Sequence, residues 1–190
     1  MQSYDYANRA GVLDLTWEDF ARLSARLAEA LAGQGVQAVI GLARAGLFPA
    51  AQVAAMLRCE LHPARLTRRL NDQVVSPHPL WKTPISPLVA GQAVAVIDEI
   101  ADSGETLRLA AEAARQAGAA SVVSACLVSH SWADPAPDVC ALVSDALVLF
   151  PWDRRVWTSA GWQPNPELAE ALQLQGFEPG DYLPAGQDWG

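Results

Sequence analysis

The chain has 190 residues, of which 51% are hydrophobic and 18% charged, and a formal net charge of −8 at pH 7. This length and composition fit one globular domain with a full core and leave room for a small appendage, and they exclude general disorder. The acidic balance argues against a nucleic-acid partner or an anionic membrane surface, because no surplus of Lys and Arg is present to build a broad basic face.

Cysteine use and the absence of targeting signals bear on the compartment. The three cysteines, Cys59, Cys126 and Cys140, are isolated, and two of them fall in strand-like runs, which predicts buried free thiols and a reducing environment. No apolar run reaches the length of a membrane span, and the N-terminus lacks the basic and apolar regions of a signal peptide. We therefore expect a cytoplasmic protein without a membrane partner.

The N-terminal part predicts a helix, a strand and a second helix. Thr16 and Asp19 have the spacing of a helix cap. An apolar face at helical spacing follows, made up of Phe20, Leu23, Leu27 and Leu31. Residues 36–42 read as a buried strand, and residues 47–58 as a helix that is apolar nearly all round, which predicts that most of its surface is buried.

The next part predicts a strand and then a long irregular segment. Residues 59–66 are strand-like, whereas residues 67–92 contain four prolines and Gly91. A segment of that length inside a compact domain is typical of a functional loop or flap. Four basic residues lie beside or within it, namely Arg65, Arg68, Arg69 and Lys82. These cations either face a bound ligand or simply aid solubility, and the sequence leaves both interpretations open.

The most informative stretch is residues 94–106. A short apolar run, typical of a buried parallel strand, ends in Asp98 and Glu99, and a loop of small residues then opens into a helix. Backbone N–H groups and the helix dipole favour an anion there, and Ser103 and Thr106 add hydroxyl donors. The carboxylates would repel that anion and instead suit hydroxyls or a divalent cation. Together these groups predict a sugar-phosphate site.

The remaining elements continue the alternation of helices and strands. A helix ends at Gly118, residues 121–128 are strand-like, and residues 139–143 and 146–150 form two further apolar runs. A short helix is expected at 167–175. Strands alternating with helices predict βαβ units and a parallel sheet, with ligands beyond the carboxyl ends of its strands.

Residues 94–106 resemble the phosphoribosyl-diphosphate motif of the type I phosphoribosyltransferases: an apolar strand, Asp-Asp/Glu, three residues, Thr/Ser-Gly, one residue and Thr/Ser. The required positions are filled by Asp98, Glu99, Ser103, Gly104 and Thr106. The resemblance implies that this substrate is bound by Asp98, Glu99, Ala101, Asp102, Ser103, Gly104, Glu105 and Thr106. It also implies that Asp98 and Glu99 hold Mg²⁺. The alternative is an ordinary turn with Asp102 or Ser103 as a helix cap, which would not require the paired carboxylates.

Arg44, Ala45 and Gly46 form a second loop between a strand and a helix, and they resemble the pyrophosphate loop of this family. Arg44 carries a charge matched to phosphate. Ala45 stands where the family commonly has a glycine, and the family's loop implies a strained peptide at Arg44–Ala45. The alternative is a plain turn with an exposed arginine.

Two further roles follow from the resemblance. Asp102 corresponds to the residue that exchanges a proton with the base in the purine-specific members, so we expect it to be the general acid/base, with helix capping as the alternative. The irregular segment 67–92 corresponds to a mobile loop that covers the diphosphate and excludes water.

The resemblance covers about two thirds of the chain and is strongest to the xanthine-guanine and archaeal hypoxanthine branch. Phe150-Pro151-Trp152-Asp153 is similar to the Phe/Gln-Pro-Trp-Asp/Glu sequence of that branch. It implies an α/β fold of the type I phosphoribosyltransferases, a Rossmann-like parallel sheet flanked by helices with a small hood or C-terminal appendage. We assign residues 1–160 to this domain and 161–190 to a tail with a short helix.

The implied reaction transfers ribose 5-phosphate from phosphoribosyl diphosphate to a nucleobase, expected to be a 6-oxopurine in purine salvage, with release of pyrophosphate. The family is commonly dimeric, so a homodimer is expected. Two departures fall on base recognition: His130 stands where the branch has a lysine, and Leu147 where it has a stacking tryptophan. Other stacking surfaces are offered by Trp132, Phe150, Trp152 and Trp157, although aromatic residues near a strand end more often belong to a core or an interface. Our candidates for base binding are His130, Leu147 and Trp152.

Two alternatives compete with the enzyme. A non-catalytic relative could bind phosphoribosyl diphosphate or a nucleotide as a regulator, and the altered base positions favour it, whereas Asp102 and Arg44 favour the enzyme. A dinucleotide-binding Rossmann domain is disfavoured, because the loop after residues 36–42 lacks Gly-x-Gly-x-x-Gly.

Overall fold

The computed structural model describes residues 9–70, 73–74 and 79–183. The chain divides into a larger unit, Ala21–Val143, and a smaller unit that combines Met1–Phe20 with Ser144–Gly190. The predicted boundary between residues 160 and 161 falls within the smaller unit, in the turn of a β-hairpin. The division into domains at that point stays a prediction.

The larger unit is built on a six-stranded sheet with the order β6-β3-β2-β7-β8-β9. Its strands are β2 (Ala38–Leu42), β3 (Glu60–Thr67), β6 (Leu80–Thr83), β7 (Ala93–Ala101), β8 (Ser121–Ser129) and β9 (Val139–Val143). All neighbouring pairs are parallel except β3 and β6. The helices of this unit are α1 (Trp17–Ala32, which begins in the smaller unit), α2 (Leu47–Leu57) and α3 (Glu105–Gln116). The α/β prediction is confirmed.

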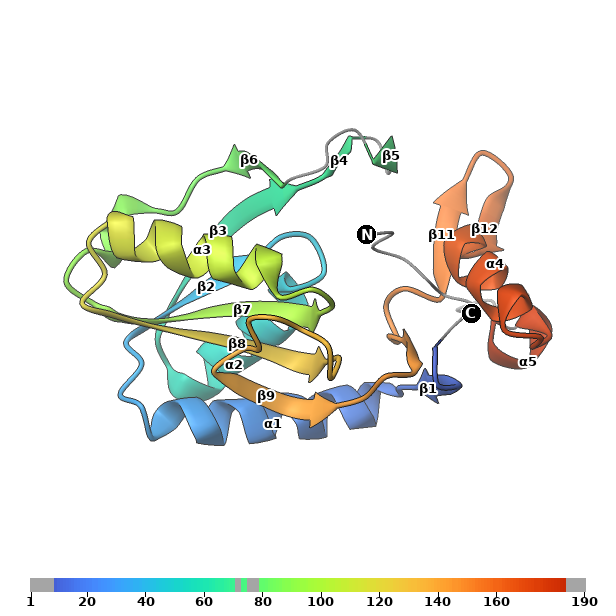
Figure 1. Ribbon diagram of the computed structural model, residues 1–190, viewed down its shortest axis with the longest axis horizontal. Helices are drawn as coiled ribbons and strands as arrows, with labels where there is room; N and C mark the ends of the chain where they lie inside the picture. The colour runs from blue at the N-terminus through green and yellow to red at the C-terminus, as the bar shows by residue number, and fades with distance from the viewer. Residues whose placement is uncertain (1–8, 71–72, 75–78, 184–190) are drawn as a thin grey trace. The chain divides into compact units, whose positions relative to one another are not determined.

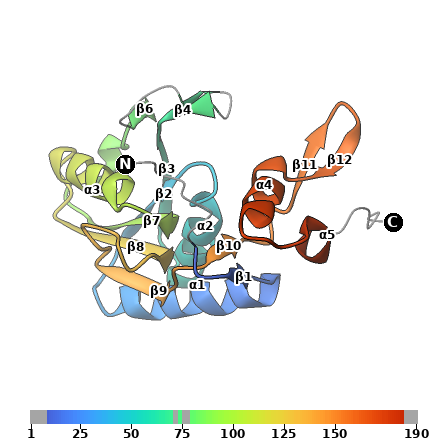
Figure 2. The ribbon, with the colours of Figure 1, turned by 45° about the vertical axis from the view of Figure 1, so that its right-hand side comes forward.

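The order of the strands places a topological switch point at the centre of the sheet. From β2 the chain passes through α2 to β3 on one side, and from β7 it passes through α3 to β8 on the other. Right-handed crossovers therefore put α2 and α3 on opposite faces of the sheet (Figures 1 and 2). Because β2 and β7 are neighbours, the crevice beyond their carboxyl ends is where such folds bind ligands. The two loops singled out in the sequence follow these two strands.

The predicted cap at the start of α1 is confirmed. The Thr16 backbone N–H donates to Asp19 Oδ2 at 2.9 Å, and the Asp19 N–H donates back to Thr16 Oγ1 at 3.1 Å. The predicted apolar face is buried along the helix, comprising Phe20, Leu23, Leu27 and Leu31. Reciprocal capping and a single apolar face thus define this helix from its own sequence.

The prediction that most of the surface of α2 is buried is wrong. Its buried residues lie on one side and are Pro49, Ala50, Val53 and Ala54. Phe48 and Met56 are 42% and 44% exposed. One side of the helix is buried and the other stays exposed in the described part of this unit, which the apolar composition of the helix could not reveal.

The segment 67–92 is less irregular than predicted. Leu80–Thr83 pairs with β3 as the antiparallel edge strand β6, and Pro87–Val89 forms a short 3₁₀ helix, η2. Two short strands, β4 (Arg69–Leu70) and β5 (Gln73–Val74), pair with each other. Backbone pairing at a sheet edge does not need an apolar sequence pattern. The prolines of this segment therefore predicted an irregular chain where an edge strand forms. Residues 71–72 and 75–78 lie outside the described part of the chain.

The smaller unit has its own core. It contains a pair of parallel strands, β1 (Val12–Asp14) and β10 (Leu147–Leu149). The elements that follow β10 are β11 (Arg155–Thr158), β12 (Gly161–Pro164), α4 (Pro166–Leu174) and α5 (Pro179–Tyr182). Its buried residues are Leu147, Leu149, Leu168, Ala171, Leu172 and Leu183. The predicted helix near 167–175 is confirmed, with Asn165 Oδ1 accepting from the Glu167 N–H at 3.0 Å.

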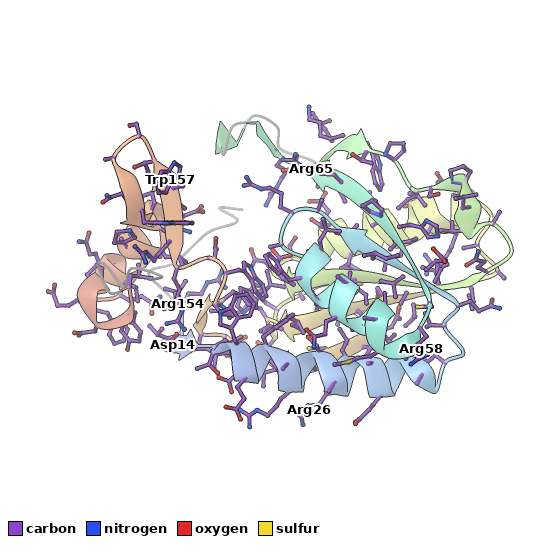
Figure 3. The ribbon with its side chains drawn as sticks, turned by 180° about the vertical axis from the view of Figure 1, so that it is seen from behind. Asp14, Arg26, Arg58, Arg65, Arg154 and Trp157 are labelled. Carbon is purple, nitrogen blue, oxygen red and sulfur yellow. The ribbon has the colours of Figure 1, made fainter. Side chains whose placement is uncertain are left out.

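One ion pair ties the two chain segments of the smaller unit together. Arg154 donates to the Asp14 carboxylate and, at 2.8 Å, to the Leu15 carbonyl (Figure 3). Elsewhere, all three cysteines are free thiols, but only Cys126 is fully buried. Over the described residues, no helix combines the length and apolarity needed to cross a membrane.

Candidate active site

The first loop of the site follows β7. Asp98 and Glu99 lie near the carboxyl end of this strand, which continues to Ala101. Gly104, the N-cap of α3, has a φ of +81°, and a methyl group there would lie 2.1 Å from the Pro135 carbonyl oxygen. Only glycine can combine this left-handed conformation with so close an approach. The loop is therefore shaped by the segment that follows β8.

The hydroxyl and amide groups of this loop surround the N-terminus of α3. Ser103 Oγ accepts from the Glu105 N–H at a long 3.4 Å, and the Ser103 carbonyl accepts from the Asp134 N–H at 3.1 Å. The cap position itself, Gly104, has no side-chain hydrogen bond to offer. The bond from Ser103 is the long one expected of a weak cap, and the positive end of the helix dipole is directed at this loop.

The second loop follows β2. The Ala43 N–H donates to the Ala64 carbonyl of β3 at 2.8 Å, and the Ala43–Arg44 peptide is cis, one bond before the position implied by the family's loop. Ala45 does not have a positive φ. An alanine can therefore replace the family's glycine here without backbone strain. Arg44 is exposed at the loop.

The second loop touches β7 at Gly46. A methyl group on this residue would lie 2.6 Å from Asp98 Oδ1 and 2.6 Å from the Leu42 carbonyl oxygen. The Asp98 carboxyl therefore lies against the backbone of the second loop, with no room for a side chain between them. The carboxyl ends of β2 and β7 thus place an arginine-bearing loop directly beside a pair of carboxylates.

The carboxylate pair has the electrostatics of a cation or hydroxyl site. Desolvation raises the pKa of Asp98 well above its ordinary value, and the neighbouring charge of Glu99 raises it further. The Glu99 N–H donates to Asp98 Oδ1 at 3.0 Å, which acts in the opposite direction. Two adjacent carboxylates with a desolvated member fit Mg²⁺, which uses one or two carboxylates and completes its shell with substrate oxygens and water. In the described chain, no three His, Cys, Asp or Glu residues form a larger metal cluster.

Asp102 has a partner that the sequence does not predict. Trp132 Nε1 donates to Asp102 Oδ1 at 3.1 Å. The Trp132 ring stacks on His130, with centroids 4.4 Å apart and 17° between the planes. His130 is only 4% exposed, whereas Trp132 is 46% exposed. The residues are 30 positions apart, so no spacing rule could have paired Trp132 with Asp102.

The other two candidates for base binding lie in the smaller unit. Leu147 is 4% exposed and belongs to the core of that unit. The Trp152 ring stacks on Phe150 at 4.8 Å and contacts Phe20 edge-on at 5.2 Å. Both side chains thus have packing roles within their own unit, and their part in base binding stays a prediction.

Arg65 is a further basic residue close to the second loop. It lies on β3 (Figure 3), next to Ala64, whose carbonyl accepts the Ala43 N–H. The Arg65 Nε atom is buried without a hydrogen-bond partner. A buried guanidinium nitrogen left unpaired is costly unless a ligand completes it, which makes Arg65 a second candidate for an anionic group.

Comparison with known proteins agrees with this geometry. Residues 15–159 match the family model described as "Phosphoribosyl transferase domain". A xanthine-guanine phosphoribosyltransferase from Nitratidesulfovibrio vulgaris is 31% identical over 153 residues, 76% of this chain and 86% of that protein. One from Cereibacter sphaeroides is 29% identical over 147 residues, 73% of this chain and 85% of that protein.

A solved structure supports the same assignment. The purine phosphoribosyltransferase of Pyrococcus horikoshii superposes with a TM-score of 0.66 at 27% identity, covering 74% of this chain and 93% of that one. This similarity shows that the two proteins share the fold described above. The chain belongs to the phosphoribosyltransferase family and is an enzyme that transfers a phosphoribosyl group to a nucleobase.

Proposed function

We propose that the chain catalyses the Mg²⁺-dependent reaction of phosphoribosyl diphosphate with a 6-oxopurine, yielding a purine nucleotide and pyrophosphate. The observation that carries this proposal is the contact between Gly46 and Asp98, which joins an arginine-bearing loop to the carboxylate pair at the switch point of the sheet. The names of the similar proteins, which are xanthine-guanine and purine phosphoribosyltransferases, support a purine as the acceptor.

We assign the binding of the sugar phosphate to both loops. Backbone N–H groups from Ala101 to Thr106, with the hydroxyls of Ser103 and Thr106, would hold the 5-phosphate at the N-terminus of α3. Arg44 and the backbone of Ala45 and Gly46 would hold the diphosphate, with Arg65 beside them. Asp98 and Glu99 would accept hydrogen bonds from the ribose hydroxyls and would hold Mg²⁺. The bound Mg²⁺ would neutralise part of the diphosphate charge.

The proposed chemistry breaks the bond between the anomeric carbon and the diphosphate oxygen and forms a bond from that carbon to a ring nitrogen of the base. The sugar passes through an oxocarbenium-like state, as in glycosyl transfer. Asp102 would take the proton that the attacking nitrogen loses. Arg44 would stabilise the departing pyrophosphate, whose negative charge grows as the bond breaks.

Base recognition is the part in which this chain departs from its branch. His130 replaces the usual lysine and its ring is buried, so Trp132 is the exposed aromatic ring of that segment. We expect recognition of the purine through the segment after β8, with Leu147 and Trp152 as further candidates. We also propose that the protein is cytoplasmic, which is consistent with its free thiols. We propose a homodimer because the family is commonly dimeric.

The test is turnover with a panel of bases. Purified protein is incubated with phosphoribosyl diphosphate, Mg²⁺ and each of hypoxanthine, guanine, xanthine, adenine, uracil and orotate, and the product is identified by mass spectrometry. A nucleotide formed from one or more 6-oxopurines supports the proposal. A nucleotide formed only from adenine or a pyrimidine contradicts the assigned base, and no product with any base contradicts the proposed reaction.

A further inference from the structure

Trp132, in the segment after β8, lies outside the phosphoribosyl-diphosphate motif but contacts a residue of that motif. The Trp132 indole N–H donates to Asp102 Oδ1 at 3.1 Å, and both residues belong to the larger unit. Asp102 is the residue to which we assign proton exchange with the base. Trp132 therefore contacts the proposed general acid/base directly.

Trp132 is held in place by its own neighbours. Its ring stacks on His130 at 4.4 Å, and His130 is 4% exposed. The His130 N–H donates to the Ala101 carbonyl at 3.0 Å, and the His130 carbonyl accepts from the Ala133 N–H at 3.2 Å. His130 is thus fixed by backbone bonds on both sides, and it fixes one face of the indole by stacking.

The loop that carries Asp102 is joined to the same segment through its backbone. The Asp134 N–H donates to the Ser103 carbonyl at 3.1 Å, and Gly104 allows the Pro135 carbonyl to approach. The indole N–H and the carboxylate are therefore held by two chain segments in mutual contact. A hydrogen bond between two such segments restricts the rotation of a short carboxylate side chain more than a bond within one loop could.

Proton exchange depends on that rotation. A general base must come within hydrogen-bond reach, about 2.6–3.2 Å, of the proton it takes. A misplacement of about 1 Å can lower a rate on the order of 100-fold. The hydrogen bond from the Trp132 indole N–H to Asp102 Oδ1 fixes the plane of the carboxylate, and with it the direction in which Oδ2 can accept a proton from the base.

We propose that Trp132 is a positioning residue for Asp102: its indole N–H, supported by the buried His130 ring, holds the carboxylate in the orientation that proton exchange requires. This inference rests on the proposed function. It also gives His130 a supporting role beneath Trp132, in addition to any contact with the base. The chemistry of the role needs a ring to stack on His130 and an N–H to reach Asp102.

Variants separate these two needs. Trp132→Phe keeps a ring and removes the donor, whereas Trp132→His keeps both a ring and a ring N–H. We expect Trp132→Phe to lower kcat about 10- to 100-fold and to leave KM for phosphoribosyl diphosphate unchanged, and Trp132→His to recover part of the loss. Trp157→Phe makes the same change at a tryptophan that is 70% exposed on a hairpin and should behave like the unmodified protein.

A second readout does not depend on turnover. The chain has seven tryptophans, so the Trp132 indole N–H is identified in a ¹H–¹⁵N spectrum as the resonance that Trp132→Phe removes. Asp102→Asn should shift that resonance. An unshifted resonance, or a kcat that Trp132→Phe leaves unchanged, overturns the positioning role. If the unmodified protein forms no nucleotide with any base, the proposed function fails, and the spectrum alone then decides whether the contact exists.

Discussion

Gly46 and Asp98 lie so close together that a methyl group on Gly46 would meet Asp98 Oδ1 at 2.6 Å and Asp98 Cα at 2.9 Å. Neither neighbour is the far end of a flexible side chain, because one is a backbone carbon and the other belongs to a short carboxylate. The loop after β2 and the strand end of β7 are thus fitted to each other through a missing side chain. This fit brings the arginine-bearing loop and the carboxylate pair together.

The first prediction concerns this contact. Gly46→Ala should lower the free energy of unfolding by about 1–3 kcal/mol, the usual cost of forcing a methyl group into a packed region. It should also reduce turnover, because the added methyl group would push the loop after β2 away from Asp98. Urea denaturation checks the first effect. Gly33→Ala is the matched control, because its methyl group would have only the Ala30 carbonyl nearby, at 3.7 Å. Equal midpoints for the two variants would contradict the predicted clash.

The second prediction follows from the raised pKa of Asp98. A carboxyl with a raised folded-state pKa contributes stability that is fully present below its unfolded pKa of about 3.9 and is lost as pH rises through the folded value. Asp98→Asn cannot ionise and avoids this loss. In metal-free buffer the variant should therefore have a higher Tm than the unmodified protein at neutral pH, and the difference should narrow as the pH falls.

Thermal unfolding with a chelator present, measured across this pH range, checks the expectation. Glu170→Gln provides the control, since it makes the same change from a carboxyl to an amide at an exposed position on α4. A difference for Asp98→Asn that stayed constant with pH would show that the carboxyl is not destabilised by desolvation.

The third prediction separates chemistry from binding at Asp102. Asp102→Asn keeps the shape of the loop and removes the proton acceptor, so kcat should fall by about 10²–10⁴-fold, the usual contribution of general acid/base catalysis. The affinity for phosphoribosyl diphosphate should be unchanged, because the proposed phosphate site uses the backbone N–H of Asp102 and not its carboxylate. Initial rates and calorimetry test the two parts, and an affinity that falls along with kcat would instead assign Asp102 to substrate binding.

The fourth prediction addresses the diphosphate. A hydrogen bond to a charged group is worth about 1.5–3 kcal/mol, so Arg44→Ala should weaken the binding of pyrophosphate by about 10- to 150-fold. Arg26→Ala removes the same charge from the exposed face of α1 and should leave the affinity as it is. If both variants bound pyrophosphate with equal affinity, Arg44 would have no part in binding the diphosphate.

Much of the site could be predicted because it is encoded locally. The stretch from Asp98 to Thr106 carries its own signals for a strand, a turn and a helix, and the left-handed φ of Gly104 accords with a glycine at that position. The cap formed by Thr16 and Asp19 is local in the same sense. Neighbouring residues that satisfy each other's backbone groups leave a readable pattern.

The remainder depends on contacts between distant segments. The bond from Trp132 to Asp102 and the approach of Pro135 to Gly104 join residues about 30 positions apart, and no sequence period connects them. The exposure of Met56 depends on what covers the outer side of α2, which its apolar sequence does not state. Side-chain composition predicts an element's tendency to be buried, but the layers of the fold decide whether it is.

The central claim is that the two loops form one site for phosphoribosyl diphosphate. Calorimetric titration of this compound into the unmodified protein, with and without Mg²⁺, tests it most directly. The account predicts one binding site per chain that is weakened by removing Mg²⁺ and by either Arg44→Ala or Asp98→Asn. Absence of binding, or binding that is indifferent to substitutions in both loops, would contradict it.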